Sequence, residues 1–220
     1  MDKRAFKDKV YTLSAKLIQA MANPRRLEII DLLGQGERSV EEIARETAMS
    51  VANTSQHLQV LKQSNLVQLR RDGNFIRYRL ANDKVYQSWQ DLRMMGMESL
   101  AEMDRLITDF RRQKNSLHPV TLEDLLVRMR SKNTILLDVR PEGEFQAGHI
   151  PRAINVPIDQ LASRIRELDK SMEYIAYCRG PFCVFADEAV ELLVKKGFKA
   201  SRLEEGFPDW KLRFPVEDVS

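Results

Sequence analysis

The residues with the clearest chemical potential are two cysteines in the segment YCRGPFC. Cys178 and Cys183 are the only cysteines in a chain of 220 residues. A chain of this length with two cysteines has no disulfide framework, so reactive thiols and small buried hydrophobic residues are the two alternatives. The segment therefore predicts either a sulfur-handling site or two ordinary thiols that happen to be neighbours.

The position of this segment favours chemistry. It joins an apolar stretch, YIAYC, to the helical pattern FADEAVELLVKK, which Gly197 ends. A loop before a helix directs several backbone N–H groups and the positive end of the helix dipole toward one point. We therefore expect Cys178 to be a thiolate and a nucleophile. Gly180 permits the curvature of the loop, and Arg179 adds a positive charge that favours an anionic sulfur donor.

The elements around this loop are those of an α/β domain. Short apolar stretches (ILLDV, AINVP, YIAYC and ASRLE) alternate with helical segments, the first of which is capped by Thr121. This alternation predicts a parallel sheet with helices on both faces and a reactive edge at the carboxyl ends of the strands. Cys178 lies at one of those ends. We expect this domain to span residues 116–220.

Residues 1–115 have a different pattern, which predicts a mainly-α winged helix-turn-helix domain. Residues 6–21 have the apolar spacing of an amphipathic helix, and Asn23-Pro24 begins a second helix that Gly34 ends. A capping box at residues 39–42 begins a third helix, and a tight turn separates it from a fourth, VANTSQHLQVLKQS. A hairpin around Asp72-Gly73 follows in the position of a wing.

The charge distribution indicates that the first half of the chain is the candidate for binding a polyanion. Residues 1–117 hold 20 Lys and Arg against 15 Asp and Glu, whereas residues 118–220 hold 15 against 17. Each piece alone also fits a solvated face or a helix core, but their ordered combination favours double-stranded DNA. The candidate DNA-binding residues are Ser50, Asn53, Thr54, Ser55, Gln56 and His57 on the second helix of the pair, and Arg70, Arg71, Asn74 and Arg77 on the wing.

The runs MANPRRLEIIDLL and SVEEIARETAMSVANTSQHLQVLKQSNLVQLRRDGNFIRYRL resemble the ArsR group of winged-helix repressors, over residues 5–110. The resemblance implies a homodimer whose first and last helices pack across the two-fold axis, on a pseudo-palindromic operator. Residues 84–114, which we expect to form one long helix, supply an apolar stripe for that packing.

One departure from that group concerns metals. Many of its members bind thiophilic metals through paired cysteines in the third helix, or through Asp and His on the last helix. This chain has ERSVEEI at the first position and no histidine at the second. Soft-metal and zinc sites need thiolate or imidazole ligands, so we expect no metal site and no cofactor.

The runs LLDVRPEGEFQAGHIPRAINVP, YCRGPFC and LEEGFPDW are similar to the rhodanese domain, over residues 119–215. The resemblance implies that a persulfide on Cys178 carries sulfane sulfur from thiosulfate, a polysulfide or a protein persulfide to a thiol acceptor. Its active-site loop comprises Arg179, Gly180, Pro181, Phe182, Cys183 and Val184. We expect Asp138, Arg140 and Glu144 to form a structural polar network, and His149 to satisfy backbone groups in a turn.

Three departures affect that expectation. Active rhodaneses often have arginine at the sixth position counted from the catalytic cysteine, where this chain has Cys183. Pro181 removes one N–H donor from the loop, and Glu205 replaces the first of two glycines. The related phosphatase pattern, Cys-x5-Arg, is excluded because the residue at its arginine position is Val184.

Cys183 has two interpretations, a small apolar residue or a resolving thiol that attacks a modified Cys178. We expect a homodimeric cytoplasmic regulator, without a signal peptide or membrane segment, in which sulfur or oxidation chemistry at Cys178 changes DNA affinity. Two alternatives stay open. The winged helix localises a sulfurtransferase enzyme, or the rhodanese-like domain is an inert scaffold.

Overall fold

The computed structural model describes residues 1–73, 75–113, 119–131 and 133–214. Contacts divide the chain into two compact units, Met1–Trp89 and Gln90–Ser220, so that the division falls within one helix, α5. Within the described ranges, no helix is long and apolar enough to cross a membrane.

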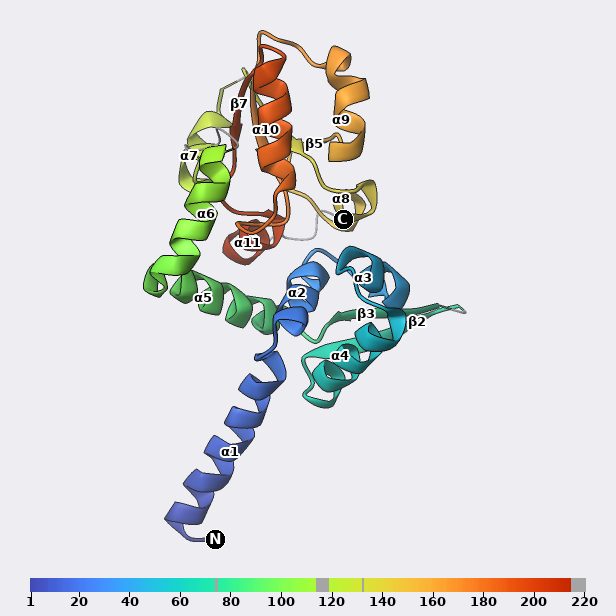
Figure 1. The fold of residues 1–220 in the computed structure, drawn as a ribbon, viewed down its shortest axis with the longest axis vertical. Coiled ribbons are helices and arrows are strands. Elements are labelled where there is room, and N and C mark those ends of the chain that lie inside the picture. Colours follow the sequence, from blue (N-terminus) through green and yellow to red (C-terminus); the bar gives the residue numbers. More distant parts are fainter. Residues whose placement is uncertain (74, 114–118, 132, 215–220) are drawn as a thin grey trace. The chain divides into compact units, whose positions relative to one another are not determined.

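The first unit is a winged helix-turn-helix (Figure 1). Its elements are α1 (Lys3–Met21), α2 (Pro24–Leu33), β1 (Arg38–Ser39), α3 (Val40–Glu46), α4 (Val51–Gln63), β2 (Val67–Asp72), β3 (Phe75–Leu80) and the start of α5 (Asp83–Ser99). The three strands form an antiparallel sheet in the order β1-β3-β2. Ile29, Ile30, Ile43, Leu58 and Leu61 are completely buried and form the centre of its core.

The predicted caps of this unit are confirmed. The Asn23 side chain accepts hydrogen bonds from the backbone N–H groups of Arg25 and Arg26 at the start of α2. Ser39 and Glu42 form the expected reciprocal capping box at the start of α3. Because these caps satisfy N–H groups that have no partner within the helix, they fix where α2 and α3 begin.

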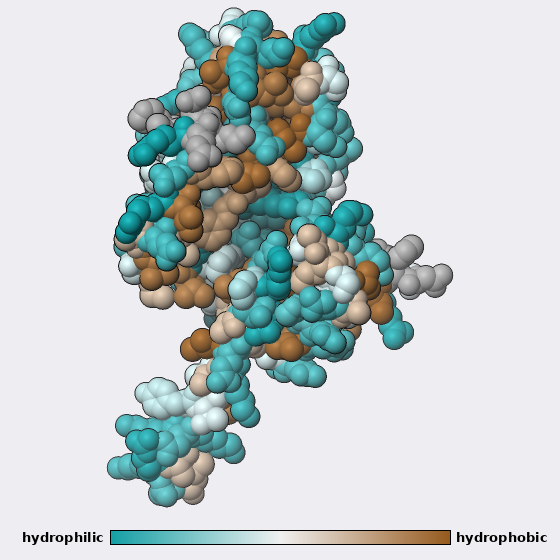
Figure 2. Space-filling view, viewed as in Figure 1, coloured by the Kyte–Doolittle hydropathy of each residue, from teal (hydrophilic) through white to brown (hydrophobic). Residues whose placement is uncertain are grey.

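The expected single helix over residues 84–114 is instead two helices, α5 and α6 (Ala101–Gln113), with a break at Leu100. The chain changes direction at this point (Figure 1), and Gly96 leaves room for a side chain of α6. A Cβ on Gly96 would lie 3.3 Å from both Sδ and Cε of Met103, so the Met103 side chain occupies the space that glycine leaves. Figure 2 shows hydrophobic residues at the surface of this corner, where Leu100 and Leu106 are exposed.

The second unit is the predicted α/β domain. Its further elements are α7 (Leu122–Arg128), β4 (Thr134–Asp138), α8 (Glu142–Ala147), β5 (Ile154–Asn155), α9 (Ile158–Arg164), a 3-10 turn (Ile165–Glu167), β6 (Glu173–Tyr177), α10 (Phe185–Lys195), β7 (Lys199–Arg202) and α11 (Phe207–Arg213). The strands are parallel and have the order β5-β4-β6-β7.

Alternate residues of the central strands point to opposite faces of this sheet, as the pleat requires. Leu137, Tyr174 and Ala176 pack in one cluster with residues of α9 and α10. Leu136, Ile175 and Tyr177 pack in a second cluster with residues of α7 and α11. The sheet is thus the middle of three layers, and Cys178 continues β6 on the α10 face.

Candidate functional site

Cys178 lies where the sequence places it, directly after β6 and before α10. Its side chain is 2% exposed and packs in the cluster beneath α10. The loop then turns sharply, since the Cys183 N–H donates to the Gly180 carbonyl at 3.1 Å and Gly180 has a φ of +148°. This left-handed conformation is one that glycine adopts without strain. The turn brings Cys183 back to Cys178.

A hydrogen bond joins the two cysteines. The Cys178 Sγ lies 3.6 Å from the Cys183 carbonyl oxygen, to which the protonated thiol donates. Burial acts to raise the pKa of Cys178. Hydrogen bonds from the Cys183 thiol and from the backbone N–H groups of Ala186 and Gly180 outweigh burial and hold this pKa below its ordinary value. The same thiol–thiol hydrogen bond, followed by burial, raises the pKa of Cys183.

The two cysteines therefore differ in acidity. The pKa of Cys178 is lowered and that of Cys183 is raised, so Cys178 ionises more readily than Cys183. Sulfur nucleophiles react as thiolates, which makes Cys178 the candidate nucleophile of the two. Arg202, at the end of β7, adds a positive charge that favours the Cys178 thiolate.

Arg202 belongs to a buried charged cluster that the sequence did not reveal. Its side chain is 1% exposed, and its Nε lies 3.4 Å from Oδ1 of Asp187 on α10. Among the residues that the structure describes, no acceptor forms a hydrogen bond with the Nε or Nη1 of Arg202. Burial and then the charge of Arg202 lower the pKa of Arg111 on α6. Two guanidinium groups, those of Arg202 and Arg111, therefore lie near Cys178, and that of Arg202 is paired with Asp187.

Arg179 differs from its expected role. Its Nε lies 3.0 Å from Oε1 of Glu144, a carboxylate that is itself buried, and its guanidinium lies 5.3 Å from the Phe185 ring centroid. A guanidinium bonded to a buried carboxylate is largely neutralised. Arg179 therefore fixes the loop to α8 and adds little charge for an anionic donor.

The predicted polar network is present as two ion pairs. Asp138 and Arg140 are fully buried, with Arg140 Nη2 at 2.6 Å from Asp138 Oδ2, while Glu144 pairs with Arg179. His149 satisfies a backbone group as expected, since its Nδ1 lies 3.0 Å from the Phe145 carbonyl oxygen, and its ring stacks on that of Phe145.

Glu205, which replaces a glycine of the rhodanese pattern, is a partly buried carboxyl group. Burial, together with the nearby charges of Glu204, Asp209 and Glu123, raises the pKa of Glu205 to about 7. Its Oε2 is buried, and no hydrogen-bond partner is found for it within the described ranges. The substitution therefore adds a titratable group beside the buried segment that begins at Gly206.

The helix-turn-helix residues divide into exposed and buried positions. Ser50, Asn53 and Gln56 are exposed, and Ser55 and His57 are half-buried. Thr54 differs from the expectation of a groove-facing side chain, because it is completely buried and its hydroxyl donates to the Ser50 carbonyl at 3.0 Å. Burial, followed by the charges of Arg26 and Arg25, lowers the pKa of His57, which favours its neutral form.

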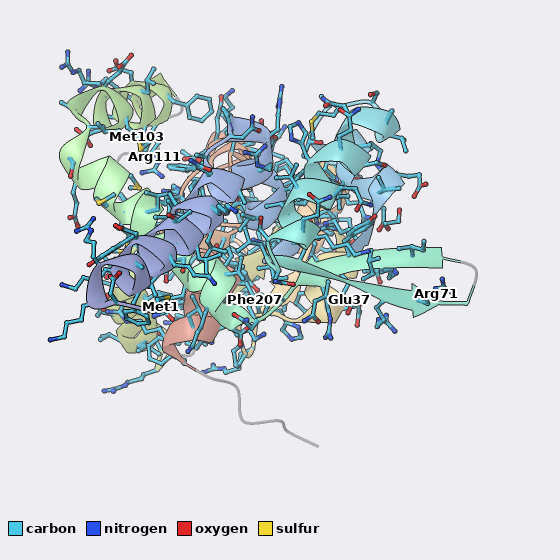
Figure 3. The ribbon with its side chains drawn as sticks, turned by 90° about the horizontal axis from the view of Figure 1, so that it is seen from below. Met1, Glu37, Arg71, Met103, Arg111 and Phe207 are labelled. Atoms are coloured by element: carbon cyan, nitrogen blue, oxygen red, sulfur yellow. The ribbon has the colours of Figure 1, made fainter. Side chains whose placement is uncertain are left out.

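The wing arginines also differ from one another. Arg70 Nε lies 2.6 Å from a carboxylate oxygen of Glu37, and Arg77 Nη1 lies 3.1 Å from the Glu37 carbonyl oxygen. Arg71 is exposed near the turn of the hairpin (Figure 3). Asn74, at the tip, lies outside the described residues. Of the predicted wing residues within the described ranges, Arg71 is therefore the best candidate for a phosphate contact.

Known families match both units. Residues 23–68 match the family described as "Bacterial regulatory protein, arsR family", and residues 121–213 match "Rhodanese-like domain". The "HTH-type transcriptional regulator Rv0324" of Mycobacterium tuberculosis is 40% identical over 205 residues, covering 93% of this chain and 90% of that protein. The "Nodulation protein NolR" of Rhizobium meliloti is 41% identical over 73 residues, which are 33% of this chain and 60% of that protein.

A solved structure also matches the first part of the chain. It is the homodimeric winged helix-turn-helix DNA-binding domain of Mb0332 from Mycobacterium bovis, with 38% identity and a TM-score of 0.43, covering 46% of this chain and 93% of that chain. The relative that matches nearly the full length, together with the two family matches, decides the classification. The chain belongs to the arsR family of bacterial regulatory proteins, and it is a DNA-binding transcriptional regulator that carries a rhodanese-like domain.

Proposed function

We propose that this regulator responds to sulfane sulfur through Cys178, and that modification of Cys178 changes its affinity for a DNA operator. The observation that carries the proposal is the contact between the two cysteines after β6, where the Cys178 Sγ lies 3.6 Å from the Cys183 carbonyl oxygen. The pKa of Cys178 is lowered there and that of Cys183 is raised. An ionisable thiol next to a protonated thiol is suited to accept a sulfur atom and then to release it.

The first step forms a persulfide. The Cys178 thiolate attacks the sulfane sulfur of a polysulfide or of thiosulfate, forming an S–S bond. The bond to the rest of the donor breaks, and the leaving thiolate or sulfite departs with the electron pair. The product is a Cys178 persulfide, and no further oxidant is required because the donor sulfur is already oxidised.

The second step uses Cys183 as the resolving thiol. Its sulfur attacks the Sγ of Cys178, a Cys178–Cys183 disulfide forms, and hydrosulfide leaves with the bonding pair and takes the Cys183 proton. The two cysteines are thereby oxidised while the sulfane sulfur is reduced to sulfide. The same disulfide follows from a peroxide, which converts Cys178 to a sulfenic acid that loses water in the second step. We place this chemistry in the reducing cytoplasm, where both thiols can be regenerated.

A homodimer is part of the proposal, and α1 supports it. Ala20 is the only buried residue of this 19-residue helix. Its apolar stripe is exposed, with Phe6 at 55%, Val10 at 44% and Leu13 at 58%. An amphipathic helix gains most of its stability from packing of its apolar face. We therefore propose that a second copy of the chain packs against the apolar stripe of α1. Leu13→Glu should convert the dimer to a monomer in light scattering.

The DNA contacts of the proposal come from α4 and the wing. Asn53 and Gln56 are exposed on α4, and their amide groups match the donor–acceptor pattern of adenine in the major groove. Ser50 and Arg71 are exposed and suit phosphate contacts.

Mass spectrometry of the polysulfide-treated protein tests the sulfur chemistry. The wild type should end as the Cys178–Cys183 disulfide, Cys183→Ser should accumulate the Cys178 persulfide, and Cys178→Ala should gain no sulfur at residue 183. If Cys178 takes up no sulfur in the wild type, the proposal is wrong. Sustained turnover with thiosulfate and cyanide, without any change in DNA affinity, would instead favour a sulfurtransferase that the winged helix localises.

A further inference from the structure

The active-site loop is held by two helices that lie outside the matched rhodanese-like segment. Arg93 of α5 is 3% exposed. Its Nη2 lies 2.6 Å from Oδ1 of Asp209 on α11, and the two side chains of this ion pair are 2% and 1% exposed. Gln90, also on α5, donates from its Nε2 to the same oxygen at 2.8 Å. Asp209 is therefore bound by α5 in the interior of the second unit.

This ion pair lies directly against the loop. A Cβ on Gly180 would be 3.3 Å from Nη1 of Arg93 and 3.4 Å from Oδ2 of Asp209. That same Oδ2 accepts a hydrogen bond from the Gly206 N–H at 2.9 Å. A Cβ on Gly206 would be only 2.3 Å from the carbonyl carbon and oxygen of Arg179, so no side chain fits there. The peptide between residues 179 and 180 is thus packed between Gly206 and the Arg93–Asp209 pair.

Two further contacts hold the outer part of the loop. Arg111 of α6, which Figure 3 labels, donates from its Nη2 to the Pro181 carbonyl at 2.9 Å. The Arg93 guanidinium also lies 5.9 Å from the centroid of the Phe182 ring. Arg179, Gly180, Pro181 and Phe182 therefore each contact α5, α6 or the segment that α5 binds. The loop is closely packed on the side away from Cys183.

We propose that Arg93 and Arg111 are positioning residues for the active-site loop, and that α5 transmits the state of Cys178 to the winged helix. The second part, transmission to the winged helix, rests on the proposed function. A sulfur atom added at Cys178, or a bond between Cys178 and Cys183, changes the volume and shape of a loop that is packed closely. The displacement reaches Arg93 through Gly180 and Phe182, its direct neighbours.

The transmission uses the continuity of α5. In the first unit, the Trp89 indole N–H donates to Oδ1 of Asp31 on α2 at 2.8 Å. In the second unit, the next residue, Gln90, binds Asp209, and Arg93 follows less than one turn later. The same helix thus carries the hydrogen bond to α2 and the ion pair to α11. We expect a displacement of Arg93 to act on Trp89 through the helix that they share.

The test removes the ion pair without leaving an unpaired buried charge. The clamp variant is Arg93→Met combined with Asp209→Asn, in which the amide oxygen of residue 209 still accepts from Gly206. The control is Arg128→Met with Glu173→Gln, which removes a partly exposed arginine–carboxylate pair at the start of β6, away from Cys178. Circular dichroism and thermal unfolding establish that both double variants are folded.

The first readout is the rate at which iodoacetamide alkylates Cys178 in the full-length protein. Trypsin cleaves after Arg179, so mass spectrometry resolves Cys178 and Cys183 in separate peptides. In the clamp variant, iodoacetamide should alkylate Cys178 at a rate that differs by about fivefold or more from the wild-type rate. Coupling is reciprocal, so if the state of the loop acts on α5, a change in the contacts of α5 also acts on the loop. The control should stay within about twofold, the small effect of a partly exposed pair. Equal rates in wild type and clamp variant would overturn the inference.

The second readout is operator affinity, with and without polysulfide treatment. If α5 transmits the signal, the clamp variant should bind the operator with the same affinity in both states, while the wild type and the control keep their response. A clamp variant that retains the full response would refute transmission through α5. If the wild type itself gives no response although its persulfide has formed, the proposed function fails, and the alkylation rates alone decide the role of Arg93.

Discussion

The hydrogen bond between the two thiols leads to a quantitative prediction for Cys183. In Cys183→Ala, the Cys178 thiolate loses the donor that contributes most to its stabilisation. A hydrogen bond to a charged group is worth about 1.5–3 kcal/mol. Since about 1.4 kcal/mol is a factor of ten in an equilibrium, the pKa of Cys178 should rise, and at a pH below it the alkylation rate should fall by about tenfold or more.

The pH dependence of Cys178 alkylation measures this change. The rate follows the thiolate fraction, so its midpoint reports the pKa of Cys178 in each variant. Cys183→Ser is the matched control, because its hydroxyl keeps a donor at the same place and should leave the midpoint well below that of Cys183→Ala. A midpoint that is unchanged or lower in Cys183→Ala would show that Cys183 does not stabilise the thiolate, and the assignment of roles to the two cysteines would fail.

Three other predictions concern Gly206 beside the loop, the buried carboxyl group of Glu205, and Arg71 on the wing. Gly206→Ala should displace the backbone of Arg179 and abolish sulfur uptake at Cys178, whereas Gly143→Ala, where an added Cβ meets nothing within 4 Å, should leave uptake unchanged in the same mass-spectrometric assay. The raised pKa of Glu205 means that stability falls as pH rises from about 4.5 to about 7, because the unfolded chain releases this proton first. In urea unfolding at pH 5 and pH 8, Glu205→Gln should lose this difference, and an identical pH dependence in both proteins would contradict it. Arg71→Ala should lower the salt dependence of operator binding by about one counterion, and an unchanged slope would exclude Arg71 as a phosphate contact.

Local signals in the sequence predicted most of the elements. The caps at Asn23 and Ser39, the hairpin at Asp72-Gly73 and the strand before Cys178 depend on residues within a few positions of one another. The direction of the Cys178 pKa shift was predicted from the backbone donors of a loop between a parallel strand and a helix, but the largest lowering contribution comes from the Cys183 side chain.

The contacts that hold the loop could not be predicted in this way. Arg93 and Asp209 are 116 residues apart, and Arg111 and Pro181 are 70 apart. A charged residue on an amphipathic helix looks the same in the sequence whether it faces solvent or a buried carboxylate. The segment LEEGFPDW was recognised as part of a family pattern, but only the structure shows that its aspartate binds α5.

The most direct test of a sulfur-responsive regulator is operator affinity at fixed salt, measured by fluorescence anisotropy for wild type and Cys178→Ala, with and without polysulfide. The operator is obtained by selection from random duplexes, and mass spectrometry of the same samples reports the state of both cysteines. Wild-type affinity should change by about five- to thirtyfold, the size of a typical allosteric coupling, while Cys178→Ala should not respond. Identical affinities in a sample whose Cys178 carries the persulfide, or has formed the disulfide, would contradict the central claim.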